Sequence, residues 1–393
     1  MTITQEGVLC LIKSAITGQS DPLPENFQLR PAMELMLSQG LGAMCYIAAL
    51  NYNLHPGSKG MAYLQDLYCL TVIHSEQQME QITRICTAFE ENGIAYMPVK
   101  GSIMKSLYPD HAMRTMCDAD ILIHEEEYPR IRTIMEQLGF QEAGESDHEH
   151  IWNNKYLMVE LHKRLMPTYN KDYYSYFGEG WDLAKVNQGC RWAMTHEDAF
   201  IYDTIHFAKH YRDASANAHF LIDLWIHMRS YPDLDQDYIR QQMRRLRMES
   251  FYDNILDVIR AWFEGGQWNE KIHRITDVLF NEDAQQKKEN KEIAKSTRAA
   301  QEVGSVSKAN KARMLHKIFP SKEQLSFSYP QWKKVPLPFA WVLRWFYLLF
   351  CRRDAIKREQ AKLDQVTEQD MENYRQDLEY IGLEFSDQVV LPE

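Results

Sequence analysis

Hydrophobic positions along the chain change their spacing several times. From about residue 6 to residue 92, apolar side chains recur three and four positions apart, which is typical of amphipathic helices. The tripeptide His-Pro-Gly at 55–57 separates two of these helices, and the second runs to about residue 91. We therefore expect residues 1–92 to form an N-terminal helical region.

A different pattern begins after Gly93, where short apolar runs of strand length alternate with helical segments. The expected order is a strand over residues 94–99, a helix over 102–108, a strand over 121–123 and a helix over 126–138. Pro109 ends the first helix, and Gly139 ends the second in the position after the C-cap. This alternation predicts a compact core that combines a sheet with helices.

Two further strand-like runs, 149–152 and 156–161, complete this core. Asn153 and Asn154 lie between them, and this pair suits the positive φ angles of a tight hairpin turn. We therefore expect residues 93–167 to form one domain.

Helical periodicity returns beyond Pro167 and predicts a second helical domain over residues 168–282. Its clearest segments are 196–209, 219–229 and 234–279. Residues 283–313 contain almost no large apolar side chains, which predicts a solvated helix or a mobile loop. A helical tail that is rich in aromatic residues is expected over 314–393.

Charge excludes one class of function. The chain has 393 residues, with 44 Lys and Arg against 55 Asp and Glu, and its formal net charge is −11. A sequence-independent nucleic-acid binder needs clustered cations that contact phosphates. We therefore do not expect nucleic acid as a partner.

The spacing of the cysteines and the length of the apolar stretches indicate in which cellular compartment the protein is found. The seven cysteines are dispersed, and none lies at metal-ligand or Cys-x-x-Cys spacing from another, as is typical of reduced thiols in the cytosol. The first residues do not have the pattern of an export signal. The longest apolar stretch, 338–351, contains Arg344 and is shorter than the roughly 20 residues of a membrane span. A cytoplasmic protein without membrane insertion is expected.

Candidate chemistry begins with two carboxylates. Asp118 and Asp120 are one residue apart at the start of a predicted strand, so both side chains point to the same face. Two carboxylates this close repel each other unless a cation lies between them. An acidic strand edge or a turn is the alternative interpretation.

A third carboxylate, Glu160, lies among apolar residues on the second strand of the hairpin, where an unpaired charge is costly to bury. Three carboxylates from two adjacent strands would form an all-oxygen site suited to Mg²⁺. The alternative is that Glu160 and His162, two residues further on, both face solvent.

The tripeptide Lys100-Gly101-Ser102 lies at a junction of strand and helix, where free backbone N–H groups favour a phosphate. Taken alone, a Gly-Ser pair is more typical of a structural turn. The order of the motifs favours a phosphate-binding role for this tripeptide. That order is Gly-Ser, a helix, an Asp-x-Asp strand, a helix and an acidic strand.

This ordered set resembles the nucleotidyltransferases of the DNA polymerase β type. More narrowly, the run MPVKGSIMKSLYPDHAMRTMCDADILI, followed by LGF and then VELH, resembles a family of largely uncharacterised bacterial nucleotidyltransferases. The resemblance is specific over Tyr96 to Arg164 and looser over the helical region with LIDLW and the Tyr329-Pro330 segment. It implies an α+β fold, in which a small mixed-sheet, polymerase β-like catalytic core is flanked by N- and C-terminal helical domains.

The resemblance also implies roles for five residues. Asp118 and Asp120 would hold two Mg²⁺ ions, with Mn²⁺ as the alternative metal. Glu160 would bind the second ion and help to activate an acceptor hydroxyl, although the superfamily more often has Asp there. Gly101 and Ser102 would hold the β- and γ-phosphates of a nucleoside triphosphate (NTP).

Two cations are candidates for further phosphate contacts, namely Lys100 and Arg114. The alternative for Lys100 is a surface position at the end of the strand. The alternative for Arg114 is an ion pair with Asp110 or Asp118.

Signals beyond the core are weaker. Asp223, an acid within an apolar helix, and His162 are candidates for the acceptor side of the site. Asp223 could instead pair with Arg229 or Lys209. A further pair, His206 and His210, shares a helix face at zinc-compatible spacing but has no evident third ligand, so core or interface roles are favoured.

The function predicted from these features is Mg²⁺-dependent transfer of a nucleoside monophosphate from an NTP to a hydroxyl or phosphate acceptor, with release of pyrophosphate. One alternative keeps the fold as a nucleotide-sensing or protein-interaction module without turnover. Another is a transferase that nucleotidylates a protein or tRNA. The sequence does not encode the acceptor, the preferred base or the oligomeric state.

Overall fold

The computed structural model describes residues 1–54, 57–168, 170–280, 335–351 and 367–383, together with a few residues between 290 and 332. The chain divides into two compact units. Of the described residues, 1–208 and 216–280 belong to the first unit, and 209–215 with those between 290 and 383 belong to the second. Most of the predicted polar segment 283–313 lies outside the described residues.

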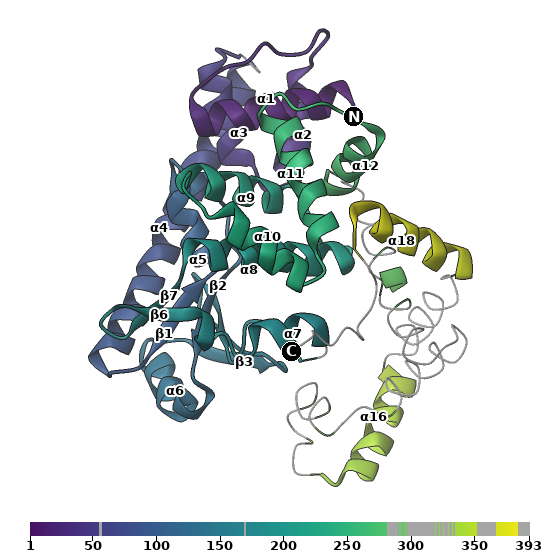
Figure 1. Cartoon of the computed structure of the whole chain (residues 1–393). Helices are drawn as coiled ribbons and strands as arrows, with labels where there is room; N and C mark the ends of the chain where they lie inside the picture. The colour runs from purple at the N-terminus through teal and green to yellow at the C-terminus, as the bar shows by residue number, and fades with distance from the viewer. Residues whose placement is uncertain are drawn as a thin grey trace. The chain divides into compact units, whose positions relative to one another are not determined.

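Four helices form the N-terminal region, as the apolar spacing predicts. They are α1 (Ile3–Thr17), α2 (Leu29–Ser38), α3 (Gly42–Asn51) and α4 (Ser58–Glu91). Thr2 begins α1 with a capping box, in which its side chain accepts from Gln5 N and its own N–H donates to the Gln5 side chain. The long helix α4 packs against α3 and continues to the sheet (Figure 1).

A seven-stranded mixed sheet follows, in the order β3-β4-β5-β2-β1-β7-β6. The strands are β1 (Tyr96–Val99), β2 (Asp118–Ile123), β3 (Gln141–Glu145), β4 (Glu149–Asn153), β5 (Met158–His162), β6 (Ala184–Gln188) and β7 (Arg191–Met194). The central strand β2 pairs antiparallel with β1 and parallel with β5, and β1 also pairs parallel with β7. The expectation of a mixed sheet among helices is therefore confirmed.

Three strands were not predicted, because their sequences carry no alternation of apolar residues. β3 reads QEAGE and β6 reads AKVNQ, and nearly all of their side chains are exposed. These two are the edge strands, which backbone hydrogen bonds to one neighbour hold in place. With β6 and β7, the sheet extends beyond Pro167 into a region for which only helices were predicted.

The predicted hairpin exists, but its turn differs from the expectation. Neither Asn153 nor Asn154 has a positive φ angle. Instead, Oδ1 of Asn154 accepts from the backbone N–H groups of Tyr156 and Leu157, and N of Asn154 donates to O of Leu157. The side-chain hydrogen bonds close the turn, so no left-handed backbone is needed.

Helices between and after the strands complete the first unit. They are α5 (Gly101–Met104), α6 (Tyr128–Gln137), α7 (Lys171–Phe177), α8 (His196–Arg212), α9 (Ala218–Ser230), α10 (Gln236–Arg245), α11 (Glu249–Phe263) and α12 (Glu270–Leu279). Gly139 follows α6 with a φ angle of 87°, as predicted. The second unit contains the end of α8, α16 (Leu337–Cys351) and α18 (Glu368–Ile381). Among the described residues, no helix has an apolar stretch long enough to cross a bilayer.

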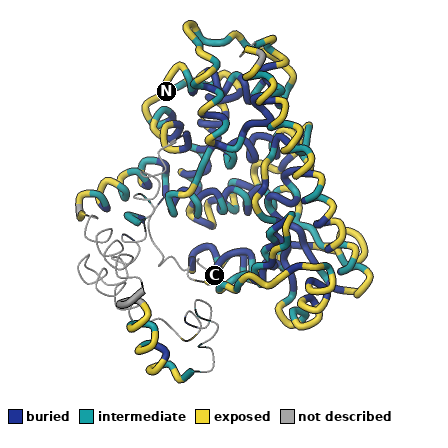
Figure 2. Tube along the Cα trace, turned by 180° about the vertical axis from the view of Figure 1, so that it is seen from behind, coloured by how far each residue is buried: buried dark blue, intermediate teal, exposed yellow. Residues whose placement is uncertain are grey.

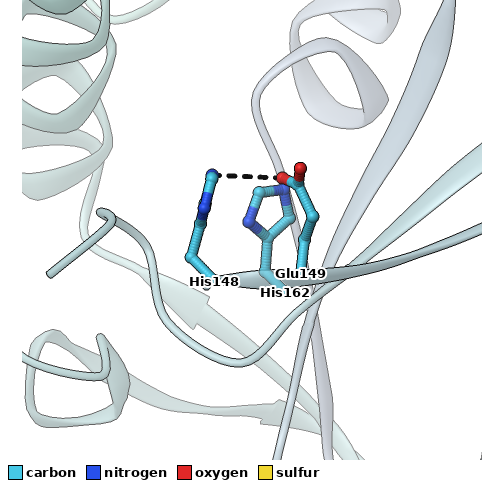
Figure 3. Close-up of side chains that lie close together, drawn as sticks. All are labelled: His148, Glu149 and His162. Carbon is cyan, nitrogen blue, oxygen red and sulfur yellow. Dashed lines mark ion pairs between the residues drawn. The ribbon is translucent and has the colours of Figure 1, made fainter. Parts of the chain in front are cut away.

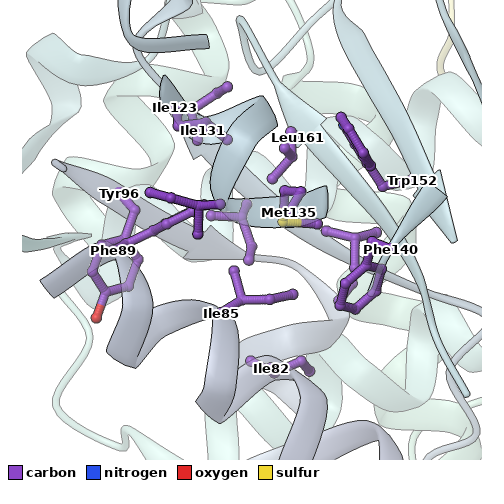
Figure 4. Packing of buried hydrophobic residues seen from close by; sticks show 14 of the residues in the cluster. Ile82, Ile85, Phe89, Tyr96, Ile123, Ile131, Met135, Phe140, Trp152 and Leu161 are labelled. Atoms are coloured by element: carbon purple, nitrogen blue, oxygen red, sulfur yellow. The ribbon is translucent and has the colours of Figure 1, made fainter. Parts of the chain in front are cut away.

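The hydrophobic core lies on one face of the sheet. Ile85 and Phe89 of α4 and Met135 of α6 are buried there against alternate residues of the strands, such as Ile123 and Leu161 (Figure 4). Buried residues fill the interior around the sheet, while the outer sides of the helices are exposed (Figure 2). Because side chains alternate along a strand, the residues next to these core positions point to the opposite face.

Candidate active site

Strands β2 and β5 bring the three predicted carboxylates to one face of the sheet. Asp120 and Glu160 are register partners on these parallel strands, and Asp118 lies two residues before Asp120. Their neighbours Ala119 and Val159 belong to the core on the other face. The carboxylates therefore gather on the face that α4 and α6 leave uncovered, as the period of two predicts.

Lys100 occupies the position directly after β1, next to Asp120. Its Nζ lies 2.7 Å from Oδ1 of Asp120, and its side chain is 14% exposed, so the alternative of a surface lysine is wrong. Its backbone has φ 50° and ψ −126°, a combination that residues with a Cβ rarely adopt. Such strain is typical of functional sites, where the surrounding structure holds the residue in place.

His162 lies beneath the carboxylates rather than in solvent, and it is 0% exposed. Its Nε2 lies 2.8 Å from Oδ1 of Asp120 and 3.5 Å from Oε2 of Glu160. The alternative that His162 faces solvent is therefore wrong. Its alternation with Leu161, which belongs to the core, was the signal that could have placed it on the carboxylate face.

The charges of this group shift its pKa values in opposite directions. Burial, together with the negative charges of Asp120 and Glu160, raises the pKa of Asp118 from 3.8 to about 6. Burial alone would also raise the pKa of Asp120, but the charge of Lys100 and the hydrogen bond from His162 outweigh it and lower that pKa. Burial is the largest cause of the raised pKa of Asp118, and the negative charges of Asp120 and Glu160 add to it. An added divalent cation fits this donor set of carboxylate oxygens.

Gly101 and Ser102 begin α5 beside these acids, and both are buried. The hydroxyl of Ser102 lies 3.4 Å from the backbone O of Asp120, so it ties α5 to β2. A Cβ added at Gly101 would lie 3.4 Å from Nη1 of Arg114. The structure thus places the predicted phosphate-binding pair next to both the carboxylates and Arg114.

Arg114 pairs with Asp223 of α9. Nε of Arg114 donates to Oδ1 and Oδ2 of Asp223, each at 3.2 Å, and Nη2 donates to Oδ2 at 2.9 Å. The hydroxyl of Tyr108 donates to Oδ1 of Asp223 at 2.6 Å. Neither of the ion pairs considered for Arg114 forms, because Arg114 pairs with Asp223, and Asp223 does not pair with Arg229. Tyr108 was not a predicted site residue, because its contact is with a helix far along the chain.

A cavity of about 170 Å³ lies beside Lys100, between β1, β7 and the helices α8 and α9. Tyr202, Asp203 and His227 line it, none of which was a predicted site residue. Burial raises the pKa of the Asp203 carboxyl, and Nδ1 of His227 lies 3.7 Å from Oδ2 of Asp203. The cavity is smaller than the pockets of roughly 300–1,000 Å³ that enclose whole small-molecule ligands, so it could take one part of a ligand.

His206 and His210 lie on α8, as predicted, but on different structural units. The ring of His206 packs 5.7 Å from that of Phe220, and Nδ1 of His210 lies 2.9 Å from Oγ of Ser215. Within the described part of the chain, neither belongs to a group of side chains that could hold a metal ion. Packing roles, the interpretation favoured above, agree with these contacts.

Comparison with known proteins supports the pattern read from the motifs. A family model described as an uncharacterised nucleotidyltransferase matches residues 30–264, which is more than half of the chain. No curated protein and no solved structure matches the chain. The matched region contains all seven strands and every residue of the candidate site. The chain therefore belongs to this family of uncharacterised nucleotidyltransferases.

Proposed function

We propose that this protein is a Mg²⁺-dependent nucleotidyltransferase, which moves a nucleoside monophosphate from an NTP to a hydroxyl or phosphate acceptor. The observation that carries the proposal is the gathering of Asp118, Asp120 and Glu160 on one face of β2 and β5, with a strained Lys100 beside them. Family membership supports the reaction class. The acceptor and the base are left open.

In the proposed reaction, an acceptor oxygen forms a bond to the α-phosphorus of the NTP. The bond from that phosphorus to the oxygen that bridges to the β-phosphate breaks, and pyrophosphate leaves with the electron pair. When the acceptor is a hydroxyl, Glu160 would take its proton, since its carboxylate is only half-buried and lies beside Asp120.

Asp118, Asp120 and Glu160 would hold the metal, with two Mg²⁺ ions expected and Mn²⁺ as the alternative. Bound Mg²⁺ would neutralise charge on the triphosphate and on the leaving pyrophosphate. The fit rests on the donor set, which is three carboxylates on adjacent strands, and on the raised pKa of Asp118. Carboxylate oxygens are the ligands that Mg²⁺ prefers.

The phosphates would bind along the start of α5. Gly101 and Ser102 would contact the β- and γ-phosphates. Lys100 would exchange its bond to Asp120 for one to a phosphate oxygen, because its Nζ is within 2.7 Å of the proposed metal ligand. Arg114 lies against Gly101 and is held by Asp223, so its cationic group is oriented before a nucleotide arrives.

Calorimetric titration of ATP, GTP, CTP and UTP in the presence of Mg²⁺ tests the proposal. The parent should bind at least one of them, and the double variant Asp118→Ala with Asp120→Ala should lose that binding. Glu126→Ala is a matched control, because the Glu126 side chain is 77% exposed and lies away from the site. The proposal is wrong if no nucleotide binds, or if the double variant binds as well as the control.

A second candidate is a nucleotide-binding module without turnover. It is favoured by one observation, namely that Asp120 already has two cationic or hydrogen-bonding partners, Lys100 and His162, within the protein. Release of pyrophosphate over a panel of hydroxyl and phosphate acceptors separates the two candidates. Nucleotide binding with no release for any acceptor would favour the module.

A further inference from the structure

A second group of possible metal ligands lies behind the carboxylates. It consists of His148, just before β4, Glu149, the first residue of β4, and His162, the last residue of β5. Glu149 and His162 are register partners on antiparallel strands, so their side chains share a face. The ligand atoms of the three residues all lie within 4.8 Å of one another. Figure 3 shows the three side chains close together, with a dashed line for the ion pair between His148 and Glu149.

We propose that His148, Glu149 and His162 bind one Zn²⁺ ion, at a site distinct from the proposed Mg²⁺ site. The proposal does not depend on nucleotidyl transfer, since the ion could be bound whether or not the protein turns over a nucleotide. It rests on how each histidine is oriented and on the chemistry of the three ligands.

The two ring nitrogens of His162 have different surroundings: Nε2 contacts Asp120, and Nδ1 is available to this group. Its Nε2 lies 2.8 Å from Oδ1 of Asp120, and an ionised carboxylate only accepts hydrogen bonds, so Nε2 carries the proton. Nδ1 has no hydrogen-bond partner, although the residue is fully buried. A buried nitrogen without a partner is costly, and coordination of a cation would satisfy it. Metal-binding histidines commonly donate their other ring N–H to a carboxylate in this way.

His148 is oriented in a similar manner. Its Nδ1 lies 3.3 Å from Oγ of Ser146, and its Nε2 lies 3.1 Å from Oε2 of Glu149. The backbone O of His148 accepts from N of Lys163 at 2.8 Å, which anchors the residue to the end of β5. An ion would therefore replace the direct contact between His148 and Glu149. The side chains of both are 12% exposed, which leaves a way in from solvent.

The ligand types select the class of ion. Two imidazoles and one carboxylate are the protein ligands of many Zn²⁺ sites that keep a fourth position open. Imidazole is a better ligand for Zn²⁺ and its neighbours in the transition series than for Mg²⁺, which prefers oxygen. The three carboxylates on β2 and β5 have the opposite preference, so the two groups would select different ions.

A third group in the described part of the chain shows the contrast. Glu125, Glu145 and His150 also lie close together, but Nζ of Lys163 forms ion pairs with both of these glutamates. This group already contains its cation. Among the described residues, the ion pair of Glu149 is with His148 rather than with a Lys or Arg, although Nζ of Lys100 lies 3.4 Å from Nε2 of His162.

The consequence of binding concerns Asp120. An ion on Nδ1 would hold the ring of His162 in place, and with it the hydrogen bond from Nε2 to Asp120. His162 would then be a positioning residue for Asp120. This consequence, unlike the binding itself, rests on the proposed function.

Titration of the metal-stripped full-length protein with Zn²⁺, and with Co²⁺ as a spectroscopic probe, tests the site. We expect one tightly bound Zn²⁺ per chain and the strong visible absorption of Co²⁺ in a site of low coordination number. His148→Ala should weaken binding by more than about 100-fold, because loss of an outer-shell partner alone costs about 10–100-fold. Glu149→Gln should weaken binding in the same direction.

Two controls locate the ion. Asp118→Asn removes a proposed Mg²⁺ ligand and should leave Zn²⁺ affinity unchanged. His74→Ala removes an exposed histidine of α4 and should also have no effect. His162→Ala is informative only if its circular dichroism and melting match the parent, so His148→Ala carries the test.

Two results would overturn the site: no Zn²⁺ bound by the folded parent, or Zn²⁺ binding that Asp118→Asn abolishes and His148→Ala retains. Failure of the proposed function gives a different pattern, in which Zn²⁺ binds as expected but no NTP does.

Discussion

Arg114 and Asp223 are 109 positions apart in the sequence, yet Nε and Nη2 of the guanidinium donate to Oδ1 and Oδ2 of the carboxylate. The pair joins the loop before β2 to helix α9, and Tyr108 adds a third hydrogen bond to the same carboxylate. The side chains of Arg114 and Asp223 are 18% and 12% exposed, so solvent screens the pair only in part. It therefore connects the segment before β2 to the helices that follow the sheet.

Asp223→Ala should lower the free energy of unfolding by about 3–5 kcal/mol, because it leaves the Arg114 guanidinium buried without its partner. The double variant Arg114→Met with Asp223→Leu should recover much of this loss, since it leaves no unpaired charge. Urea unfolding of the parent and both variants measures these differences. A loss below about 1 kcal/mol for Asp223→Ala would place the pair with exposed ion pairs of little effect.

Lys100→Gly and Lys100→Ala form a matched pair that separates backbone strain from charge. Both remove the ammonium group beside Asp120, so both should weaken NTP binding to a similar extent. Only glycine adopts φ 50° and ψ −126° without strain, so the glycine variant should be more stable than the alanine variant by about 1–3 kcal/mol. Equal unfolding free energies of the two variants would contradict the strained backbone.

Binding of Mg²⁺ and nucleotide should weaken as the pH falls through about 6, because the carboxyl group of Asp118 has a pKa raised to about 6 and must be ionised to act as a ligand. The effect of Asp118 on the free energy of unfolding has the opposite dependence on pH. A raised carboxyl pKa means that the folded state binds the proton more tightly, so this group lowers the stability of the metal-free protein as the pH rises from about 4 to 6. Calorimetric titrations at several pH values, with Asp118→Asn for comparison, measure the first effect. A binding constant that does not change across this range would contradict it.

Lys105 is 1% exposed, and burial lowers its pKa from 10.5 to about 8. Between about pH 8 and 10.5 the unfolded chain binds this proton and the folded protein does not, so Lys105 should make stability rise with pH in that window. Lys105→Met should remove this contribution, at the cost of the 2.7 Å hydrogen bond from Nζ to O of Arg114. Unfolding of both proteins at pH 8 and above tests it, with Lys185→Met on the exposed strand β6 as the control. The prediction is wrong if both variants change with pH as the parent does.

Gly180 and Gly178, at the turn between α7 and β6, allow a test of close packing. Both have positive φ angles, 98° and 54°. A Cβ at Gly180 would lie 2.5 Å from Cγ of Leu165, whereas one at Gly178 would meet nothing within 4 Å. Gly178→Ala should cost about 1–2 kcal/mol for the backbone alone, and Gly180→Ala should cost about 1–3 kcal/mol more for the clash. Thermal melting of the two variants compares them, and equal melting temperatures would contradict the crowding at Gly180.

Most helices and the central strands could be predicted, because one face of each is buried. Their apolar residues therefore repeat with the period of a helix or of a strand. The N-terminal helices and the strands β1, β2, β4 and β5 all carry such a repeat. Edge strands such as β3 and β6 bury almost no side chains, so their sequences carry no comparable pattern. The turn at Asn154 also differs from the prediction, because side-chain hydrogen bonds close it without the expected backbone conformation.

The sequence by itself determined that Asp118, Asp120 and Glu160 share a face, since this follows from the period of two along each strand and the order of the motifs. The tertiary structure alone decided what these groups meet. Lys100 and His162 pair with Asp120, Asp223 holds Arg114, and His148 meets Glu149 beside His162. Local periodicity sets the direction of a side chain, whereas its partner depends on which distant segments the sheet and helices bring together.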